Sequence, residues 1–320
     1  MSGTIVDVPG IAVGQDQDAI ALTGCSVVLL GRDGGIAGVD VRGGAPGTRE
    51  TDLLAPVNSA ERIHAICLTG GSAYGLDAAG GVMRALEERG IGYRVRDVLV
   101  PLVPAAVIFD LGIGDAKRRP DAAMGYRCVE LASSDPPIEG NAGAGCGATV
   151  GKVLGLDRAM KSGIGSASVR NKQGVVVGAI VVVNAVGSVI DPSSGKILAG
   201  PRNEAGAAVD AAAVLRERGW NREPPIATNT TIGVVATNAA LTKTQATKVA
   251  QMAHNGLART ISPAHTSRDG DTLFAVCVGN VQTASDVVGA LAVEAVMAAV
   301  LRAVTQAHGA GGLPAYCDLK

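Results

Sequence analysis

Residues 224–236 read PPIATNTTIGVVA and join a polar turn directly to a run of residues typical of a buried strand. The β-branched and small residues that follow the prolines predict a strand over residues 230–236. Residues 175–184, a Val/Ile run broken only by Gly178-Ala179, predict a second strand that is buried on both faces. Residues 273–278 predict a third. The sequence therefore places a polar Asn-Thr-Thr at the entrance of a buried sheet.

Helical patterns surround these strands. They are expected at residues 76–89, 207–218, 242–260 and 283–307, and the last is apolar nearly all round, so it must be covered on most sides. Runs of strands and helices with fully apolar members predict an α+β fold in which sheets are layered between helices. Two prolines in residues 98–109 indicate an edge or a connection rather than a central strand. The polar, proline-containing residues 115–140 are expected to be a surface excursion.

Composition excludes several classes of function. The chain of 320 residues carries 28 Lys+Arg against 29 Asp+Glu, a net charge of -1, which argues against nucleic-acid binding. Its six cysteines form no Cys-x-x-Cys pair and its four histidines no His-x-x-x-His pair, so no metal and no cofactor are expected. The apolar residues 287–304 are interrupted by Glu294 and Arg302, which favours a buried element over a membrane span. No secretory signal is recognised at the start, and a cytoplasmic protein is expected.

One glycine-rich segment, GAGCGATVGK at residues 143–152, has two nucleotide-binding interpretations, and both fail. A phosphate loop needs glycine where Cys146 stands and a hydroxyl where Val153 stands. A dinucleotide fingerprint requires a strand before the segment, and none is predicted. A tight glycine turn packed on a neighbouring backbone is the better interpretation. Lys152 at its end is either a solvated surface group or a side chain held in a pocket.

The Asn229-Thr230-Thr231 segment has two interpretations. It is a turn that caps a strand, or it creates an N-terminal nucleophile by a cut between Asn229 and Thr230. In the second case the Thr230 hydroxyl attacks the Asn229 carbonyl, and hydrolysis of the resulting ester releases a new amine. That amine, with an ordinary pKa of about 7.7–8.0, supplies the local base that a threonine otherwise lacks.

Two carboxylates precede the third strand in Ser267-Arg268-Asp269-Gly270-Asp271-Thr272. A solvated turn and a calcium-type loop are alternatives, but the further oxygen ligands of a calcium loop do not follow. In extended backbone Asp269 and Asp271 point the same way. If this strand lies beside that of Thr230, the two carboxylates could orient the hydroxyl and ammonium groups of the nucleophile.

Taken in order along the chain, five segments resemble the DmpA-type self-processing aminopeptidases. This family also contains the β-aminopeptidases and the endo-type 6-aminohexanoate-oligomer (nylon oligomer) hydrolases, and the chain is most similar to the last branch. The resemblance covers nearly the whole chain. Its segments are residues 68–76, 103–110 and 143–152, Asn184, and Asn229-Thr230-Thr231.

The resemblance implies an αββα sandwich of the N-terminal-nucleophile type. It implies one domain, residues 1–320, that cuts itself into a large fragment, residues 1–229, and a small fragment, residues 230–320, and forms a homotetramer of such pairs. Thr230 stands at the nucleophile position, Asn184 at an oxyanion donor and Lys152 at a lysine that lines the nucleophile pocket.

The pair Asp269 and Asp271 implies the nylon-oligomer branch, because the aminopeptidases tend to have Ser and Glu there. Phe109 and Tyr74 fall at the substrate pocket, and at Phe109 relatives can have a tyrosine whose hydroxyl this chain lacks. We therefore expect a hydrolase of linear aliphatic amides, with an aminopeptidase for small N-terminal residues as the alternative. The partner is then a small amide or peptide, with no nucleic acid and no membrane. A non-catalytic binding protein, in which Asn-Thr-Thr is only a turn, is the rival class.

Overall fold

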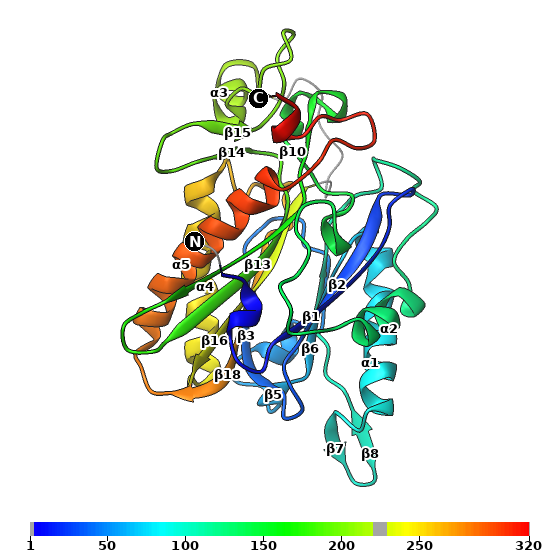
Figure 1. The fold of residues 1–320 in the computed structure, drawn as a ribbon, viewed down its shortest axis with the longest axis vertical. Helices are drawn as coiled ribbons and strands as arrows, with labels where there is room; N and C mark the ends of the chain where they lie inside the picture. Colours follow the sequence, from blue (N-terminus) through cyan, green and yellow to red (C-terminus); the bar gives the residue numbers. More distant parts are fainter. Residues whose placement is uncertain (1–2, 220–228, 320) are drawn as a thin grey trace.

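Two β-sheets lie face to face at the centre of the computed structural model, which describes residues 3–219 and 229–319 (Figure 1). One sheet has six strands in the order β12-β13-β16-β18-β3-β5, and the other has five in the order β1-β2-β6-β9-β4. Helices α4 and α5 cover the outer face of the six-stranded sheet, and α1 and α2 cover that of the five-stranded sheet. The layers confirm the predicted αββα sandwich of the α+β class.

The elements follow one another closely along the chain. The helices are α1 Ala78–Glu88, α2 Ala122–Glu130, α3 Ala211–Arg218, α4 Lys243–Thr260 and α5 Ser285–Thr305. The strands of the six-stranded sheet are β3 Gly35–Val41, β5 Arg62–Ile63, β12 Ile164–Arg170, β13 Val176–Asn184, β16 Thr230–Ala239 and β18 Thr272–Val281. Those of the five-stranded sheet are β1 Ala12–Asp18, β2 Thr23–Leu29, β4 Thr48–Arg49, β6 Ala65–Thr69 and β9 Ala105–Val107.

Smaller elements complete the fold. The three-stranded sheet β15-β14-β17 and two strand pairs are formed by β7 Tyr93–Val95, β8 Val98–Val100, β10 Thr149–Val150, β11 Met160–Lys161, β14 Ser188–Ile190, β15 Ile197–Ala199 and β17 Ile261–Ser262. The 3₁₀ turns are η1 Ile5–Asp7, η2 Asp52–Leu54, η3 Ser72–Asp77, η4 Gly143–Gly145, η5 Lys152–Leu154, η6 Leu156–Arg158 and η7 Tyr316–Leu319.

Strand β13 shows how the Val/Ile run makes a central strand. All nine of its residues are buried. Alternate side chains pack into different layers, because successive residues of a strand point to opposite faces. Val177 and Val181 join the cluster under α4 and α5, while Ile180 and Val182 join the cluster between the two sheets. A strand in this position needs apolar side chains at every position, as the sequence has.

Helix α5 is a core helix. By length and hydropathy it is the one helix among the described residues that would suffice to cross a bilayer, and 56% of its apolar window is buried inside the fold. It lies on β12 so closely that a Cβ at Gly165 would stand 2.1 Å from the carbonyl oxygen of Ala299. Glycine at this strand position lets the helix backbone approach the sheet.

One sequence prediction about the five-stranded layer is wrong. Strand β9 is an interior strand between β6 and β4, not an edge or connection. Pro101 and Pro104 lie outside the bounds of β8 and β9, so neither removes a ladder hydrogen bond inside a strand. The excursion at residues 115–140 contains α2, whose N-cap Asp121 accepts from the N–H of Met124 and which packs against α1. The polar turn predicted at the start of residues 224–236 lies mostly outside the described residues.

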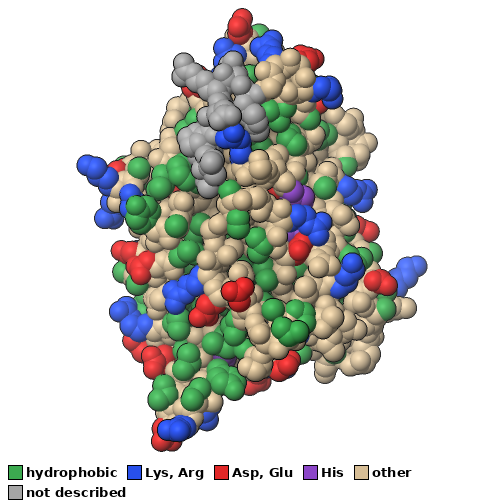
Figure 2. All heavy atoms as spheres, turned by 180° about the vertical axis from the view of Figure 1, so that it is seen from behind, with side chains coloured by type: hydrophobic (Ala, Val, Ile, Leu, Met, Phe, Trp, Pro, Cys, Tyr) green, Lys and Arg blue, Asp and Glu red, His purple; other side chains and the backbone are tan. Residues whose placement is uncertain are grey.

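Charges of both signs are interspersed on the face shown in Figure 2, and neither sign gathers into a patch there. At the narrow end of the molecule the β7–β8 hairpin extends from the body (Figure 1) and exposes three large apolar side chains, Tyr93, Val95 and Val98. The face shown in Figure 2 carries no basic stripe of the kind that follows a nucleic-acid backbone.

Candidate active site

Three neighbouring strands bring the predicted site residues together. Thr230 begins β16 and lies opposite Asn184, the last residue of β13, in an antiparallel pair. Directly opposite residues share a face, with their Cβ atoms about 4.5–5.5 Å apart. On the other side β16 runs parallel to β18, and a bridge between Asn229 and Asp269 extends this pairing beyond the strand. The predicted proximity of the Thr230 and Asp269-Asp271 segments is therefore present in the structure.

The carbonyl oxygen of Asn229 accepts two hydrogen bonds. One comes from the Thr230 hydroxyl, and the other comes from the N–H of Gly270 at 2.9 Å. Asn229 is fully buried and Thr230 nearly so. The hydroxyl therefore lies beside the peptide bond at which the self-cleavage interpretation places the cut, and a buried backbone donor polarises the carbonyl of that bond. Gly270 had no predicted role, because the identity of a residue does not show where its backbone N–H points.

The two carboxylates hold the backbone around the nucleophile. Asp271 Oδ1 accepts from the N–H of Thr231 at 2.7 Å, and Oδ2 accepts from the N–H and Nδ1 of His265 at 3.0 and 2.8 Å. Asp269 accepts from the N–H groups of Val186, at 3.3 Å, and Thr266, at 3.2 Å. Within the described part of the chain, neither the Asp269 nor the Asp271 carboxylate accepts a hydrogen bond from the Thr230 hydroxyl. Their predicted role in orienting that hydroxyl stays a prediction.

Lys152 and Asn184 form a second buried group. Lys152 is 7% exposed, and its Nζ donates to the backbone oxygen and to Oδ1 of Asn184, both at 2.8 Å. The N–H of Thr149 also donates to Asn184 Oδ1, at 3.0 Å. Nδ2 of Asn184 donates to the carbonyl of Phe109 at 3.1 Å. An amide nitrogen has two N–H donors, and this bond uses one of them.

The glycine-rich turn that carries Lys152 packs as predicted. A Cβ at Gly147 would stand 2.2 Å from the carbonyl oxygen of Leu22, and one at Gly151 would stand 2.1 Å from the carbonyl carbon of Gly200. Gly151 also has a φ of +75°, a conformation that favours glycine. The turn therefore packs against other backbone segments, and it holds Lys152 in the interior instead of leaving it solvated.

Burial changes the pKa values of two site residues. It lowers the pKa of Lys152 to about 7, although the carboxylates of Asp269 and Asp110 oppose the change. It raises the pKa of Asp269 to about 6, with a further contribution from the neighbouring Asp271. Both groups therefore titrate near neutral pH, as is frequent for residues of active sites.

A further buried pair beneath this site was not singled out in the sequence. Lys161 is fully buried, and its Nζ donates to the carbonyls of Ala148 and Ser162 at 2.9 and 2.7 Å. Burial lowers the pKa of Lys161 to about 8. Asp110, next to Phe109, accepts from the N–H of Gly71 at 2.7 Å, and burial raises its pKa. The sequence signal for these two residues was weak, since one lysine and one aspartate far apart in the chain form no spacing pattern.

The two predicted pocket residues differ in their placement. The backbone of Phe109 touches the site through its bond from Asn184. The side chain of Tyr74 is 61% exposed on η3, with the guanidinium carbon of Arg119 3.7 Å from its ring centre. Their contact with substrate stays a prediction. In the described part of the chain no three His, Cys, Asp or Glu side chains are grouped so that they could hold a metal ion.

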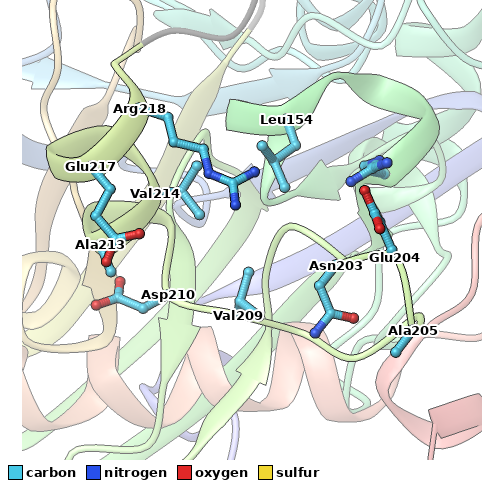
Figure 3. Close-up of a pocket in the computed structure, with 11 residues that line it drawn as sticks. Leu154, Asn203, Glu204, Ala205, Val209, Asp210, Ala213, Val214, Glu217 and Arg218 are labelled. Carbon is cyan, nitrogen blue, oxygen red and sulfur yellow. The ribbon is translucent and has the colours of Figure 1, made fainter.

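One surface pocket, of about 520 Å³, is lined by none of the predicted site residues. Side chains of α3 and its flanks form one part of its lining, and Leu154, Asn203 and Glu204 form another (Figure 3). Leu154 is two residues beyond Lys152 on η5. Charges of both signs line this pocket, including Arg218 and Glu217. No step of the chemistry is assigned to it.

The fold and the family to which the chain belongs define an amide-hydrolysing enzyme of the N-terminal-nucleophile fold. The structure superposes with a TM-score of 0.73 on the L-aminopeptidase D-Ala-esterase/amidase of Ochrobactrum anthropi, described as a variant of that fold, over 98% of this chain and 88% of the other at 21% identity. Peptidase family S58 matches residues 3–315. The chain belongs to peptidase family S58, which confirms the predicted family.

Curated relatives carry two kinds of name. An uncharacterized aminopeptidase of Mycobacterium leprae is 42% identical over 99% of this chain and 94% of its own length. A 6-aminohexanoate-oligomer endohydrolase of a Kocuria species is 34% identical over 93% of this chain and 84% of its own length. Of these two, the relative named an aminopeptidase is the more similar, although the sequence analysis favoured the oligomer-hydrolase branch.

Proposed function

We propose that this chain is a self-activating amide hydrolase whose nucleophile, Thr230, is released by cleavage of the Asn229–Thr230 bond. The observation that carries the proposal is the pair of hydrogen bonds on the Asn229 carbonyl, from the Thr230 hydroxyl and from the N–H of Gly270. The hydroxyl is next to the carbonyl that it must attack, and the Gly270 N–H is placed to stabilise the negative oxygen that forms there.

Self-cleavage then proceeds in two steps. Oγ1 of Thr230 adds to the Asn229 carbonyl carbon, the carbon–nitrogen bond breaks, and the hydroxyl proton ends on the Thr230 nitrogen. Water hydrolyses the resulting ester, which leaves a carboxylate on Asn229 and a free amine and hydroxyl on Thr230. The products are a large fragment of residues 1–229 and a small fragment of residues 230–320.

Turnover of substrate uses the same hydroxyl. The Thr230 amine accepts the hydroxyl proton as Oγ1 attacks the substrate amide, and the departing amine receives a proton. Asn184, opposite Thr230, supplies its second Nδ2 N–H to the oxyanion. Water then hydrolyses the acyl-enzyme. Lys152 and Asp269, which titrate near neutral pH, set the charge around the reacting groups.

We propose linear aliphatic amides, such as 6-aminohexanoate oligomers, as the substrate class, on the basis of the paired Asp269 and Asp271. Hydrolysis of small N-terminal residues from peptides is the second candidate, because the relative with 42% identity is named an aminopeptidase. The proposal includes a cytoplasmic homotetramer of cleaved pairs that acts on small amides or peptides and has no nucleic-acid, membrane or cofactor partner.

The test compares two substrates on three proteins. A 6-aminohexanoate trimer and alanine p-nitroanilide are offered to the natural chain, Thr230→Ala and Thr230→Ser. We expect the natural chain to hydrolyse the trimer faster, Thr230→Ala to hydrolyse neither, and Thr230→Ser, which keeps a hydroxyl, to retain activity. Faster release of p-nitroaniline by the natural chain would favour the second candidate. Undiminished hydrolysis by Thr230→Ala would contradict the nucleophile.

A further inference from the structure

His265 donates two hydrogen bonds to one carboxylate oxygen of Asp271. Its main-chain N–H and its ring Nδ1 lie 3.0 and 2.8 Å from Asp271 Oδ2. A carboxylate oxygen accepts, so Nδ1 carries the ring proton. This pair of hydrogen bonds is made from an uncommon backbone conformation, because His265 has a φ of +57°, in the left-handed region. Such conformations persist where the surrounding structure holds them, and they are frequent at functional sites.

The other oxygen of the same carboxylate reaches the nucleophile's neighbour. Asp271 Oδ1 accepts from the N–H of Thr231 at 2.7 Å, and both residues are buried. The carboxylate thus links His265 on one side to the backbone immediately after Thr230 on the other. Movement of the Asp271 side chain would release the first peptide of β16, and Thr230 would lose its alignment with the Asn229 carbonyl.

Another side of the His265 ring contacts the His254 ring, which is uncharged. The ring packs against His254, with centroids 4.8 Å apart and planes at 72°. His254 Nε2 contacts the backbone oxygen of Asp40 at 2.9 Å, and burial lowers the pKa of His254 to about 4, so this ring is uncharged at neutral pH. Asp40 is itself paired with Arg42 at 2.7 Å. Nε2 of His265 is buried and has no hydrogen-bond partner among residues 3–219 and 229–319. Asp271 is therefore the hydrogen-bonding group on which the His265 ring acts.

We propose that His265 is a positioning residue for Thr230: by clamping Asp271 it fixes the Thr231 N–H and holds the nucleophile against the Asn229 carbonyl. The inference rests on the proposed function for its effect on chemistry, but the clamp itself is a property of the uncut chain. The two parts are therefore tested by different measurements.

The variants separate the donor from the backbone strain. His265→Gly relieves the left-handed conformation and deletes the Nδ1 donor. His265→Asn also tolerates that conformation, and its Nδ2 occupies about the place of Nδ1, so the bond to Asp271 is kept. If the glycine variant does not fold, His265→Gln replaces it, because its amide lies one carbon further out. Arg96→Gly is the control: Arg96 has a φ of +54° in the exposed turn between β7 and β8, away from the site.

Two readouts are taken. The first is the amide exchange of Thr231 by NMR in a Thr230→Ala background, where no chemistry occurs. The second is the rate of self-cleavage with Thr230 present. We expect His265→Gly to speed the exchange and slow the cleavage at least tenfold, His265→Asn to stay within threefold of the parent in both, and Arg96→Gly to match the parent.

Equal exchange rates in the glycine and asparagine variants, whether both fast or both slow, would overturn the clamp. Altered exchange with unchanged cleavage would overturn its role in positioning Thr230. If the parent chain does not cleave at all, the proposed function fails, and the exchange rates still decide whether His265 clamps Asp271.

Discussion

Thr230, the first residue of β16, lies directly opposite Asn184, the last residue of β13, in the antiparallel pair of these strands. The nucleophile and its proposed oxyanion donor are thus held by adjacent backbones and not by flexible loops. Groups on paired strands keep their separation well, which a preorganised site requires. The Lys152 Nζ and the Thr149 N–H fix the orientation of the Asn184 amide by occupying its oxygen.

Replacing Asn184 with aspartate tests the oxyanion role. Asn184→Asp keeps an acceptor for Thr149 and Lys152 but removes both Nδ2 donors. We expect kcat for amide hydrolysis to fall by about 10²–10³, the usual effect of losing one oxyanion donor, while KM changes little. Steady-state kinetics on the cleaved enzyme measures both. A kcat within fivefold of the natural enzyme would remove Asn184 from the chemistry.

Adding one methyl group at Gly270 tests the geometry at the cut. A Cβ there would stand 2.9 Å from Thr230 Oγ1 and 2.6 Å from the carbonyl oxygen of Ala45. We expect Gly270→Ala to shift the Thr230 hydroxyl, the Ala45 backbone or the Gly270 N–H itself, and self-cleavage should slow at least tenfold. The matched control is Gly80→Ala in α1, whose Cβ would meet nothing within 4 Å. If both variants cleave at the parent's rate, the Gly270 donor has no part in the cut.

The pKa of Lys152 predicts a dependence of stability on pH. Lys152 loses its proton near pH 7 in the folded chain and near 10.5 when unfolded. Between these values the unfolded state holds the extra proton, so the free energy of unfolding rises with pH, by at most about 1.4 kcal/mol per pH unit for one group. Lys161 adds the same sign from about pH 8. Asp269 has the opposite sign between 3.8 and about 6, where stability falls as pH rises.

Lys152→Met should therefore reduce the rise of the unfolding free energy with pH between pH 7 and 8, where Lys161 contributes less than Lys152. Urea unfolding of the uncut Thr230→Ala chain at several pH values measures it, and Lys172→Met, which alters an exposed lysine, is the control. If the free energy of unfolding of Lys152→Met depends on pH as it does in the parent, the prediction that Lys152 is buried and neutral above pH 7 is wrong.

The sequence predicts the main strands and helices well because their signals are local. The Val/Ile run of β13 needs a doubly buried position, and Thr242 with Gln245 forms the capping box that starts α4. Strand β9 was mispredicted because Pro101 and Pro104 dominate a segment whose strand is only three residues long. Helix α2 was missed although Asp121 is a typical N-cap, since the surrounding polar residues favour a loop.

The site was predicted only as far as residue types indicate it. Thr230, Asn184 and the Asp269-Asp271 pair carry recognisable chemistry, and family resemblance supplied their roles. Their mutual register depends on the order β13-β16-β18, which long-range pairing decides. The bonds of Asp271 to Thr231 and His265, and the Gly270 N–H on the Asn229 carbonyl, depend on backbone directions that no residue pattern encodes.

The intact mass of the freshly purified, denatured protein tests the central claim most directly. We expect two fragments, residues 1–229 and 230–320, of about 23 and 9 kDa when 32.0 kDa is divided in proportion to length. The smaller fragment should begin with Thr-Thr-Ile, and Thr230→Ala should remain whole. A single 32 kDa species that persists in the natural chain after long incubation would contradict self-activation at Thr230.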